Sequence, residues 1–195
     1  MPDPWRDAVI VDDRTLLAQL RAGEENAIAL LFERYYEALC AFAIAYTSSG
    51  AEAEEVVDDV FLHLWEARER LEIRDSVKGY LYMATRNRAL NHARHVRAER
   101  RWIDAAWEPD DPPGMGQALP SVEDELHAAE FVRAVRDAVD RLPPRCRQVF
   151  LLHRQHGLTY TEIGTALEIS PRTVENLIAR SLRHLRKGLA HFLAR

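Results

Sequence analysis

Apolar residues recur at steps of three and four along most of the chain, the spacing of one face of an α-helix. The pattern predicts a short helix capped by Asp13, then helices over Ala27–Tyr46, over Glu52–Arg70, and from Val77 to about Arg101. β-branched residues are scattered and never alternate with polar ones over more than a few positions, so no strand is expected. The predicted fold class is all-α.

The helical pattern stops after Trp102. Residues Asp104–Pro120 contain four prolines, two glycines and four acids. An interior proline costs a helix ~3 kcal/mol, so this stretch is not helical. We interpret it as a flexible acidic linker between two small helical domains, with an ordered surface loop as the alternative. The expected division is a tail over 1–13, a first domain over 14–103, the linker over 104–123 and a second domain over 124–195.

Helical spacing resumes at Ser121, and Pro143-Pro144 ends one helix and begins the next, which runs to Gly157. The segment Tyr160–Leu177 that follows has the apolar spacing of a helix-turn-helix. Within it the small Gly164 lets the second helix approach the first. An ordinary helical hairpin without DNA contact is the alternative.

The second helix of this segment is expected to begin with Ser170 as N-cap and Pro171 as its first residue. Glu168 stands in the tight turn, where glycine is usual and where a left-handed backbone would cost about 1 kcal/mol. In a DNA-binding helix-turn-helix the first residues of the second helix meet base edges, and Arg and Asn pair with guanine and adenine. The polar residues predicted to face away from the core are Arg172, Thr173, Glu175, Asn176 and Arg180.

The net charge of −5 conceals two basic blocks. Six arginines lie between residues 86 and 101, and five arginines plus Lys187 lie between residues 171 and 195, each block with one acid. These blocks predict two places for an anion, with solvated helix faces as the alternative. Cys40 and Cys146 are too few for a disulfide framework or a cysteine zinc site, and no apolar run approaches the roughly 20 residues that span a bilayer.

Motifs of enzymes are missing from the sequence. There is no P-loop, no glycine-rich dinucleotide turn and no nucleophile elbow, and the pair His153 and His156 lacks the glutamate of a zinc protease. Cys146 lies on an apolar helical face and is expected in the core. Acids on a plain helix, such as Glu52, Glu55 and Asp59, lack the turn that wraps oxygens around a cation. We expect no catalysis, no cofactor and no metal.

Three features stand in order in the first half: the acidic and aromatic stretch Glu54–Trp65, the stretch Lys78–His92, and the arginine tail to Arg101. With the helix-turn-helix behind them, the chain resembles the extracytoplasmic-function group of the sigma-70 family of bacterial transcription initiation factors. The resemblance covers about residues 14–100, as family region 2, and residues 124–190, as family region 4.

This resemblance implies an RNA polymerase sigma factor that acts in the cytoplasm and directs initiation at promoters. The implied partners are core RNA polymerase, through its clamp helices and flap, promoter DNA and an anti-sigma factor, without membrane insertion. The residues implied to contact polymerase are Glu55, Asp58, Asp59 and Leu62, while Val57, Phe61 and Trp65 face the core.

The promoter-reading residues are implied in the same way. Tyr80 and Tyr82 are open to two interpretations, because aromatics beside a basic helix stack on unpaired bases or pack between helices. Those implied for the −10 element are Lys78, Tyr80, Tyr82, Arg86, Asn87, Arg88, Asn91, Arg94 and Arg97. Those implied for the −35 element are Tyr160, Arg172, Thr173, Glu175, Asn176, Arg180 and Arg183.

Two other functions fit parts of the sequence. A helix-turn-helix regulator of the response-regulator type also carries a sequence like Ser170–Asn176 and would bind duplex DNA without polymerase. However, the first half lacks the alternating strands and acidic pocket of such a regulator. A protein-interaction module that inhibits initiation would bind polymerase but direct no transcript.

Overall fold

The computed structural model describes residues 11–73, 76–100 and 126–190. These ranges form eight α-helices and no strand, which confirms the all-α prediction for the described part of the chain. None of these helices combines the length and the apolar character that crossing a membrane requires. The helices are α1 (Asp13–Arg21), α2 (Glu25–Ala43), α3 (Gly50–Ala67), α4 (Val77–Arg100), α5 (Leu126–Asp140), α6 (Pro144–Arg154), α7 (Tyr160–Leu167) and α8 (Pro171–Gly188).

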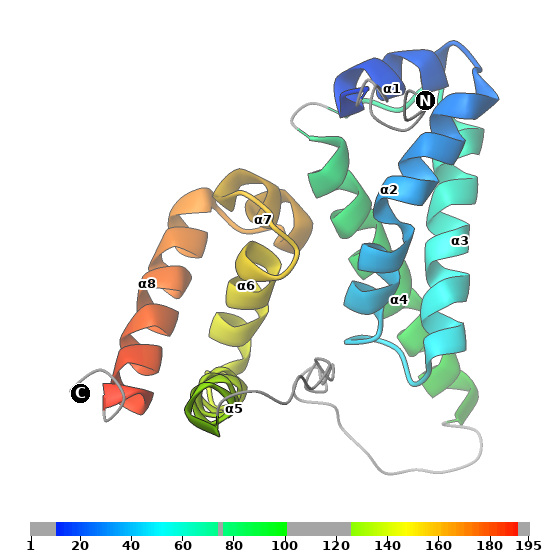
Figure 1. The fold of residues 1–195 in the computed structure, drawn as a ribbon. Helices are drawn as coiled ribbons and strands as arrows, with labels where there is room; N and C mark the ends of the chain where they lie inside the picture. The colour runs from blue at the N-terminus through cyan, green and yellow to red at the C-terminus, as the bar shows by residue number, and fades with distance from the viewer. Residues whose placement is uncertain (1–10, 74–75, 101–125, 191–195) are drawn as a thin grey trace, which may run out of the picture.

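Helices α2, α3 and α4 lie side by side in the N-terminal half, with α1 across one end of them (Figure 1). Each turns its apolar stripe inward, so the centre of this bundle is closely packed. The stripe residues that lose nearly all contact with solvent include Leu31, Leu39, Phe42, Val56, Leu64 and Leu81. The bundle holds α3 and α4, the helices that carry the first set of implied site residues.

Several helix ends differ by a few residues from the sequence prediction. Helix α1 is capped by Asp12 rather than Asp13, and the Asp12 carboxylate accepts hydrogen bonds from the N–H groups of Arg14 and Thr15 at 2.9 and 3.0 Å. The Asp13 carboxylate instead forms an ion pair with Arg34 of α2, with Oδ1 of the aspartate 2.5 Å from Nη1 of the arginine. Helix α2 begins and ends earlier than predicted, α3 begins two residues earlier and ends earlier, and residues 121–125 lie outside the described part.

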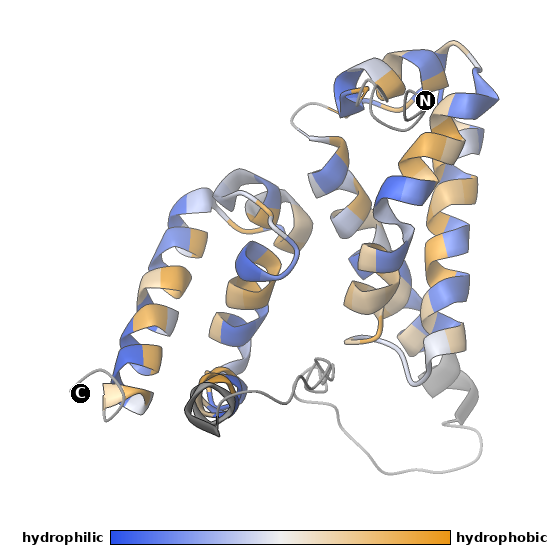
Figure 2. Cartoon of the chain, in the orientation of Figure 1, coloured by the Kyte–Doolittle hydropathy of each residue, from blue (hydrophilic) through white to orange (hydrophobic). Residues whose placement is uncertain are grey.

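The C-terminal half packs α6, α7 and α8 together and lays α5 against α8. Figure 2 shows α8 with an apolar face toward α6 and a polar face on its other side. Cys146 is 1 % exposed and belongs to a small cluster with Ala138, Leu142 and Leu185, as the sequence predicted for a core cysteine. The hydrophobic residues of this half that are buried outside that cluster are Val149, Leu152, Leu158, Ile163, Ala166, Leu167, Val174 and Ile178.

Those eight residues belong to the same hydrophobic cluster as the core of the N-terminal half. The contact runs chiefly between α4 and α7, which pack more extensively than any other pair of helices in the described ranges. The sequence left the relative placement of the halves open. The contact between α4 and α7 joins the two halves directly. The segment predicted as a linker, 104–123, lies outside the described residues.

Candidate nucleic-acid interface

Helices α7 and α8 form the helix-turn-helix predicted from the apolar spacing. At the start of α7, Thr159 and Glu162 form a capping box: the Glu162 carboxylate accepts from the Thr159 N–H at 2.8 Å, and the Thr159 hydroxyl accepts from the Glu162 N–H at 3.2 Å. At its end, Glu168 takes the left-handed conformation, with φ 57°. A Cβ on Gly164 would lie 2.8 Å from the carbonyl oxygen of Ile169, so this position requires glycine. Both predictions for the turn are confirmed.

Helix α8 begins as predicted. The Ser170 hydroxyl accepts a hydrogen bond from the N–H of Thr173 at 3.1 Å, and Pro171 is the first helical residue. The first turn of α8 presents polar side chains to solvent, as DNA contact requires. The implied −35 residues of α8 are all exposed: Arg172, Thr173, Glu175, Asn176, Arg180 and Arg183.

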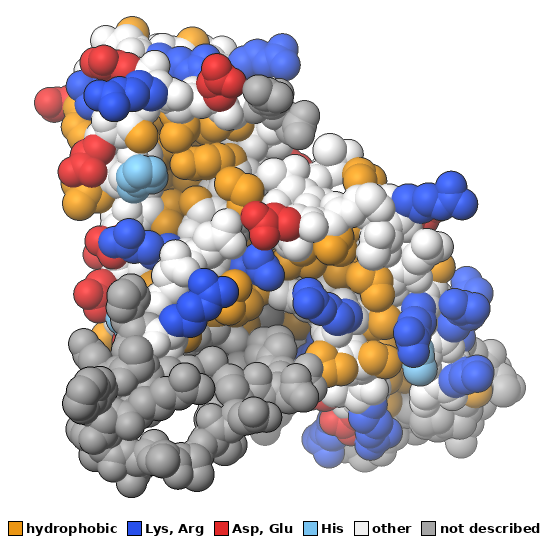
Figure 3. Space-filling view, turned by 180° about the vertical axis from the view of Figure 1, so that it is seen from behind, with side chains coloured by type: hydrophobic (Ala, Val, Ile, Leu, Met, Phe, Trp, Pro, Cys, Tyr) orange, Lys and Arg blue, Asp and Glu red, His pale blue; other side chains and the backbone are white. Residues whose placement is uncertain are grey.

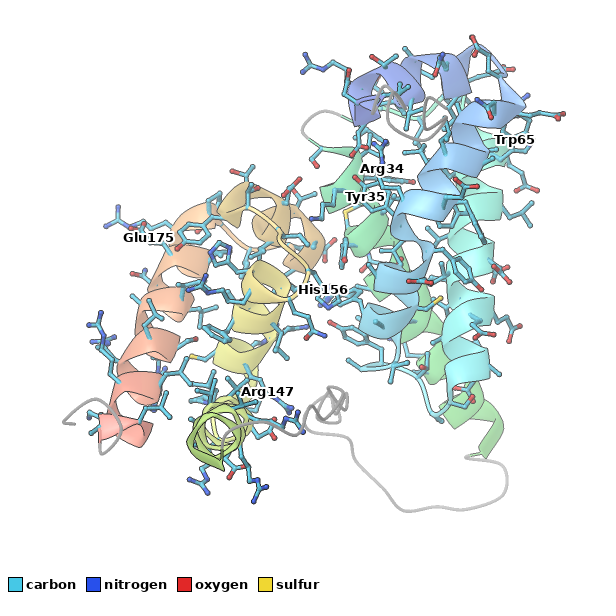
Figure 4. All side chains as sticks on the ribbon, viewed as in Figure 1. Arg34, Tyr35, Trp65, Arg147, His156 and Glu175 are labelled. Carbon is cyan, nitrogen blue, oxygen red and sulfur yellow. The ribbon has the colours of Figure 1, made fainter. Side chains whose placement is uncertain are left out.

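The charge of α8 favours an anionic partner. Arg172, Arg180, Arg183, Arg186 and Lys187 are exposed on it against a single acid, Glu175. Figure 3 shows Lys and Arg side chains clustered at the edge of the molecule where α8 runs, and acidic side chains down the opposite edge. Figure 4 shows Glu175 on the outer side of α8, away from the other half.

Tyr160, implied with this set, lies at the start of α7 rather than on α8. It is half-buried, packs against the core and meets His153 edge-to-face, with ring centroids 5.2 Å apart. Its ring therefore packs the start of α7 against the core of the C-terminal half.

Helix α4 carries the implied −10 residues, and its start is capped by Ser76, whose hydroxyl accepts from the N–H of Gly79 at 3.2 Å. Arg88, Asn91 and Arg94 are exposed, and Arg94 donates to the Asn91 side-chain oxygen at 3.0 Å. Half-buried Arg86 donates to the side-chain oxygen of its neighbour Asn87 at 3.3 Å. Asn87, Asn91 and Arg94 share one face of α4 by their spacing, and the side chain of Arg97 lies outside the described residues.

The first turns of α4 are covered by the C-terminal half. The Lys78 ammonium donates to the carbonyl oxygens of His156 and Gly157 at 2.7 and 3.0 Å. Tyr82 is 1 % exposed, and its hydroxyl lies 3.0 Å from Nδ1 of His156. Tyr80 is half-buried and packs against the core. Both tyrosines therefore pack against hydrophobic neighbours in this arrangement, and their contact with DNA stays a prediction.

His156 also belongs to this contact, although the sequence analysis considered it only as one of a pair of histidines. Its ring meets Tyr82 and Phe42 edge-to-face, with centroids 5.5 and 6.2 Å apart, so it enters the N-terminal core (Figure 4). Burial, and then the nearby Lys78 charge, lower its pKa to about 4. Nothing in the neighbouring sequence signals that the other half covers this histidine.

The outer face of α3 carries the residues implied for polymerase. Glu55, Asp58 and Leu62 are exposed, and Leu62 keeps 56 % of its surface. Val57 and Phe61 are buried as predicted, whereas Trp65 is half-buried beneath the Arg68 guanidinium at 4.2 Å. The predicted polymerase-contact residues Glu55, Asp58 and Leu62 are therefore open to solvent on one side of α3.

Phe32 on α2 extends this surface, although the sequence analysis did not select it. Its ring is 37 % exposed, stacks on Tyr36 at 4.3 Å and touches Phe61 at 5.0 Å between centroids. Asp59, by contrast, is half-exposed and is paired with Arg88 of α4. In the described residues no group of three His, Cys, Asp or Glu side chains is arranged to hold a metal ion.

Comparison with known families matches both halves. Residues 31–101 match the family model described as Sigma-70 region 2, and residues 132–185 match that described as Sigma-70, region 4. The chain belongs to the sigma-70 family. The two regions stand in the order that the sequence resemblance implied, with the described α4 in the first match and the helix-turn-helix in the second.

Two bacterial sigma factors are similar to this chain along almost their whole length. The chain is 24 % identical over 186 residues to the RNA polymerase sigma-H factor of Pseudomonas aeruginosa, covering 93 % of this chain and 95 % of that protein. It is also 24 % identical over 172 residues to the ECF RNA polymerase sigma-E factor of Escherichia coli K12, covering 87 % and 90 %. This sigma factor therefore falls in the extracytoplasmic-function group.

A solved structure has the same fold. The sigma factor RpoE of Bartonella quintana, in complex with the anti-sigma factor NepR, superposes with a TM-score of 0.55 at 20 % identity, covering 82 % of this chain and 94 % of that one. The all-helical architecture of two halves is thus the architecture of a known sigma factor.

Proposed function

We propose that this sigma factor directs promoter-specific initiation by docking on core RNA polymerase through α2 and α3 and reading DNA through α4 and α8. The observation that carries the proposal is the exposed polar start of α8, set in a chain that also carries region 2. A helix-turn-helix alone fits many regulators, whereas regions 2 and 4 in one chain fit a sigma factor.

The polymerase surface is proposed to comprise Glu55, Asp58 and Leu62 of α3 with the exposed edge of Phe32 on α2. An apolar anchor rimmed by acids suits a partner surface that is basic around an apolar centre. The clamp helices of polymerase are the proposed site for this surface, and the flap is the proposed site for the C-terminal half.

For the −35 element, we propose that Arg172 and Asn176 read bases from the first turns of α8, since these residues are exposed where a recognition helix enters the major groove. Thr173, Glu175, Arg180 and Arg183 complete the face, and the arginines further along contact phosphates. For the −10 element, the exposed residues Arg88, Asn91 and Arg94 carry the first contact along α4.

The other proposed partner is an anti-sigma factor, as in the Bartonella quintana complex. We place the action of the protein in the cytoplasm and propose that it catalyses no reaction itself. Two weak DNA-reading surfaces held on one polymerase gain effective concentration, so each can be weak alone.

The test is transcription reconstituted with core RNA polymerase on sheared genomic DNA of the source organism, followed by sequencing of the RNA 5′ ends. We expect new starts that depend on the chain and share two upstream motifs. Binding to polymerase without any new start would indicate an inhibitor of initiation. A symmetric footprint from the chain alone, without polymerase, would indicate a helix-turn-helix regulator and overturn the proposal.

A further inference from the structure

The outer face of α3 carries a stripe of acids around one leucine. This acidic stripe comprises Glu55, Asp58, Leu62 and Glu66, which follow one another at steps of three and four residues and are all exposed. Helix α3 contains no Lys or Arg, so these carboxylates have no partner of opposite charge on their own helix. The stripe is therefore a negative surface whose apolar centre, Leu62, keeps 56 % of its surface.

The outer face of α8 carries a stripe of the opposite charge. This basic stripe comprises Arg172, Ala179, Arg183 and Arg186, at steps of seven, four and three residues, and all four are exposed. The residue in the middle, Ala179, has only a Cβ, so an apolar side chain of a partner can lie between the longer arginines. The stripe is therefore a positive surface with a low centre.

The acidic stripe and the basic stripe cannot meet within one chain. Figure 1 shows α3 and α8 at opposite edges of the molecule, and Figure 3 shows basic side chains at one edge and acidic side chains down the other. Two copies of the chain can bring the stripes together. Complementary charges of this kind select a partner and fix the register in which it binds.

The spacing of the charges fits an antiparallel pair of helices. With Leu62 of one copy on Ala179 of the other, Asp58 and Arg183 each lie four residues from this centre, which is about 6 Å along the helix axis. In an antiparallel pair these two residues lie on the same side of the centre. The carboxylate of one copy therefore meets the guanidinium of the other.

A second pair of charges repeats the match further from the centre. Glu55 and Arg186 each lie seven residues from it, about 10 Å along the axis. The acidic first turn of α3 then faces the basic last turn of α8. Antiparallel helices also place the positive end of each helix dipole beside the negative end of the other. Charges and dipoles thus favour the same arrangement.

We propose that a second copy of this chain docks here, with α8 of one copy antiparallel on α3 of the other. Each copy keeps one stripe free, so the association is head-to-tail. A single pair of helices buries less than the roughly 1,200 Å² of a stable interface, so the association is weak and falls as salt rises. A docked copy covers the proposed polymerase surface of one chain and the proposed −35 helix of the other; only this consequence rests on the proposed function.

Light scattering on the purified full chain tests the association. At about 100 µM chain in about 50 mM salt, the mean mass should exceed that of one chain, and in about 500 mM salt it should return to that of one chain. The mass of one chain at both salt concentrations would overturn the proposal. This measurement needs neither polymerase nor DNA, so its failure is distinct from failure of the proposed function, in which no new RNA start is found.

Charge exchange at the central pair shows whether these stripes make the contact. Asp58→Arg and Arg183→Asp should each weaken the association at least about tenfold, because like charges then face each other. Mixing the two chains, or combining both substitutions in one chain, should restore it. Asp137→Arg and Arg133→Asp, at exposed positions of α5, are the controls and should leave the mass unchanged. Association that survives Asp58→Arg, or equal loss in all four single variants, would overturn the assignment.

A cross-link between copies tests the register. In chains that carry Cys40→Ser and Cys146→Ala, a copy with Leu62→Cys is mixed with a copy with Ala179→Cys under mild oxidation at low salt. The control mixture replaces the second copy with one carrying Val132→Cys, at a position of α5 that is 50 % exposed. We expect disulfide-linked dimers to form several times faster in the first mixture, because only there do the two thiols face each other. Equal rates in the two mixtures would contradict the docking of Leu62 on Ala179.

Discussion

Arg88 of α4 and Asp59 of α3 form an ion pair in which Nε and Nη2 of the arginine donate to the same carboxylate oxygen at 2.9 and 2.5 Å. Sequence resemblance assigned these residues to different partners, Arg88 to DNA and Asp59 to polymerase. The pair therefore links the two proposed surfaces. If Arg88 turns to DNA, the Asp59 carboxylate loses its partner, and if Asp59 turns to polymerase, the Arg88 guanidinium loses its partner.

Removing this ion pair is expected to leave stability nearly unchanged. Its side chains are 54 % and 37 % exposed, and exposed pairs contribute ~0–1 kcal/mol. Arg88→Ala and Asp59→Ala should each shift the free energy of unfolding in urea by less than about 1 kcal/mol. Initiation lost in Arg88→Ala would then reflect a lost contact, whereas a large loss of stability would show that the pair is structural.

Leu62→Ser should weaken binding to core polymerase without unfolding the chain. The side chain is 56 % exposed, so its removal costs the fold only about 0.5 kcal/mol. Ile44→Ser is the control, since Ile44 is 42 % exposed at the opposite end of the bundle and lies outside the proposed surface. Fluorescence anisotropy with labelled chain measures both. Equal loss of binding in the two variants would contradict the assignment of α3.

The double variant Arg172→Ala and Asn176→Ala should lose initiation at promoters that depend on the −35 element. Both side chains are exposed on α8, so polymerase binding and the melting temperature should stay unchanged. Arg133→Ala and Arg136→Ala, two exposed arginines of α5, give a matched control that should keep initiation. Loss of polymerase binding in the α8 variant would mean that this face meets the enzyme rather than DNA.

Gly164→Ala should destabilise the helix-turn-helix. Its new Cβ would lie 2.8 Å from the Ile169 carbonyl oxygen, a backbone atom that cannot move away alone, and overpacking of this kind costs ~1–3 kcal/mol. Gly50→Ala is the control, because nothing lies within 4 Å of its Cβ and helix propensity favours alanine by about 1 kcal/mol. Thermal unfolding should show a lower melting temperature for the first variant only.

Acid should weaken the fold through His156. Because its folded pKa of about 4 lies below the ordinary 6.5, the unfolded chain binds a proton in this interval that the folded chain does not. Stability therefore falls as pH drops from about 6.5 toward 4, and His156→Gln should reduce that slope. His63→Gln, at an exposed position of α3, should leave it unchanged. Urea unfolding between pH 7 and pH 5 measures the difference; equal slopes would remove His156 as the cause.

The helix-turn-helix could be predicted because its signals are local. The Ser170 cap, the small Gly164 and the apolar spacing all lie within one short segment, so neighbouring residues decide the structure. The left-handed Glu168 shows the same: an unfavourable residue is tolerated where the flanking helices fix the turn.

The covering of α4 could not be predicted in this way. Whether Tyr82 faces DNA or a core depends on His156, which is distant in the sequence, and the close approach at Gly79 depends on Thr165. The N-cap of α1 also depended on a residue from another helix. Asp12 and Asp13 were equally suitable acids, and Arg34 of another helix decided between them.

The Glu162 carboxylate holds the beginnings of two helices at once. One oxygen accepts from Thr159 at the start of α7, and the other accepts from Ser76, the residue that caps α4. Burial raises the pKa of this group, but the hydrogen bonds from Ser76 and Thr159 outweigh it and keep the carboxylate ionised. A chimera that joins one half of this chain to the other half of a distant relative would lose this shared hydrogen bonding. It would keep it only if the relative has serine at the position of Ser76 or glutamate at the position of Glu162.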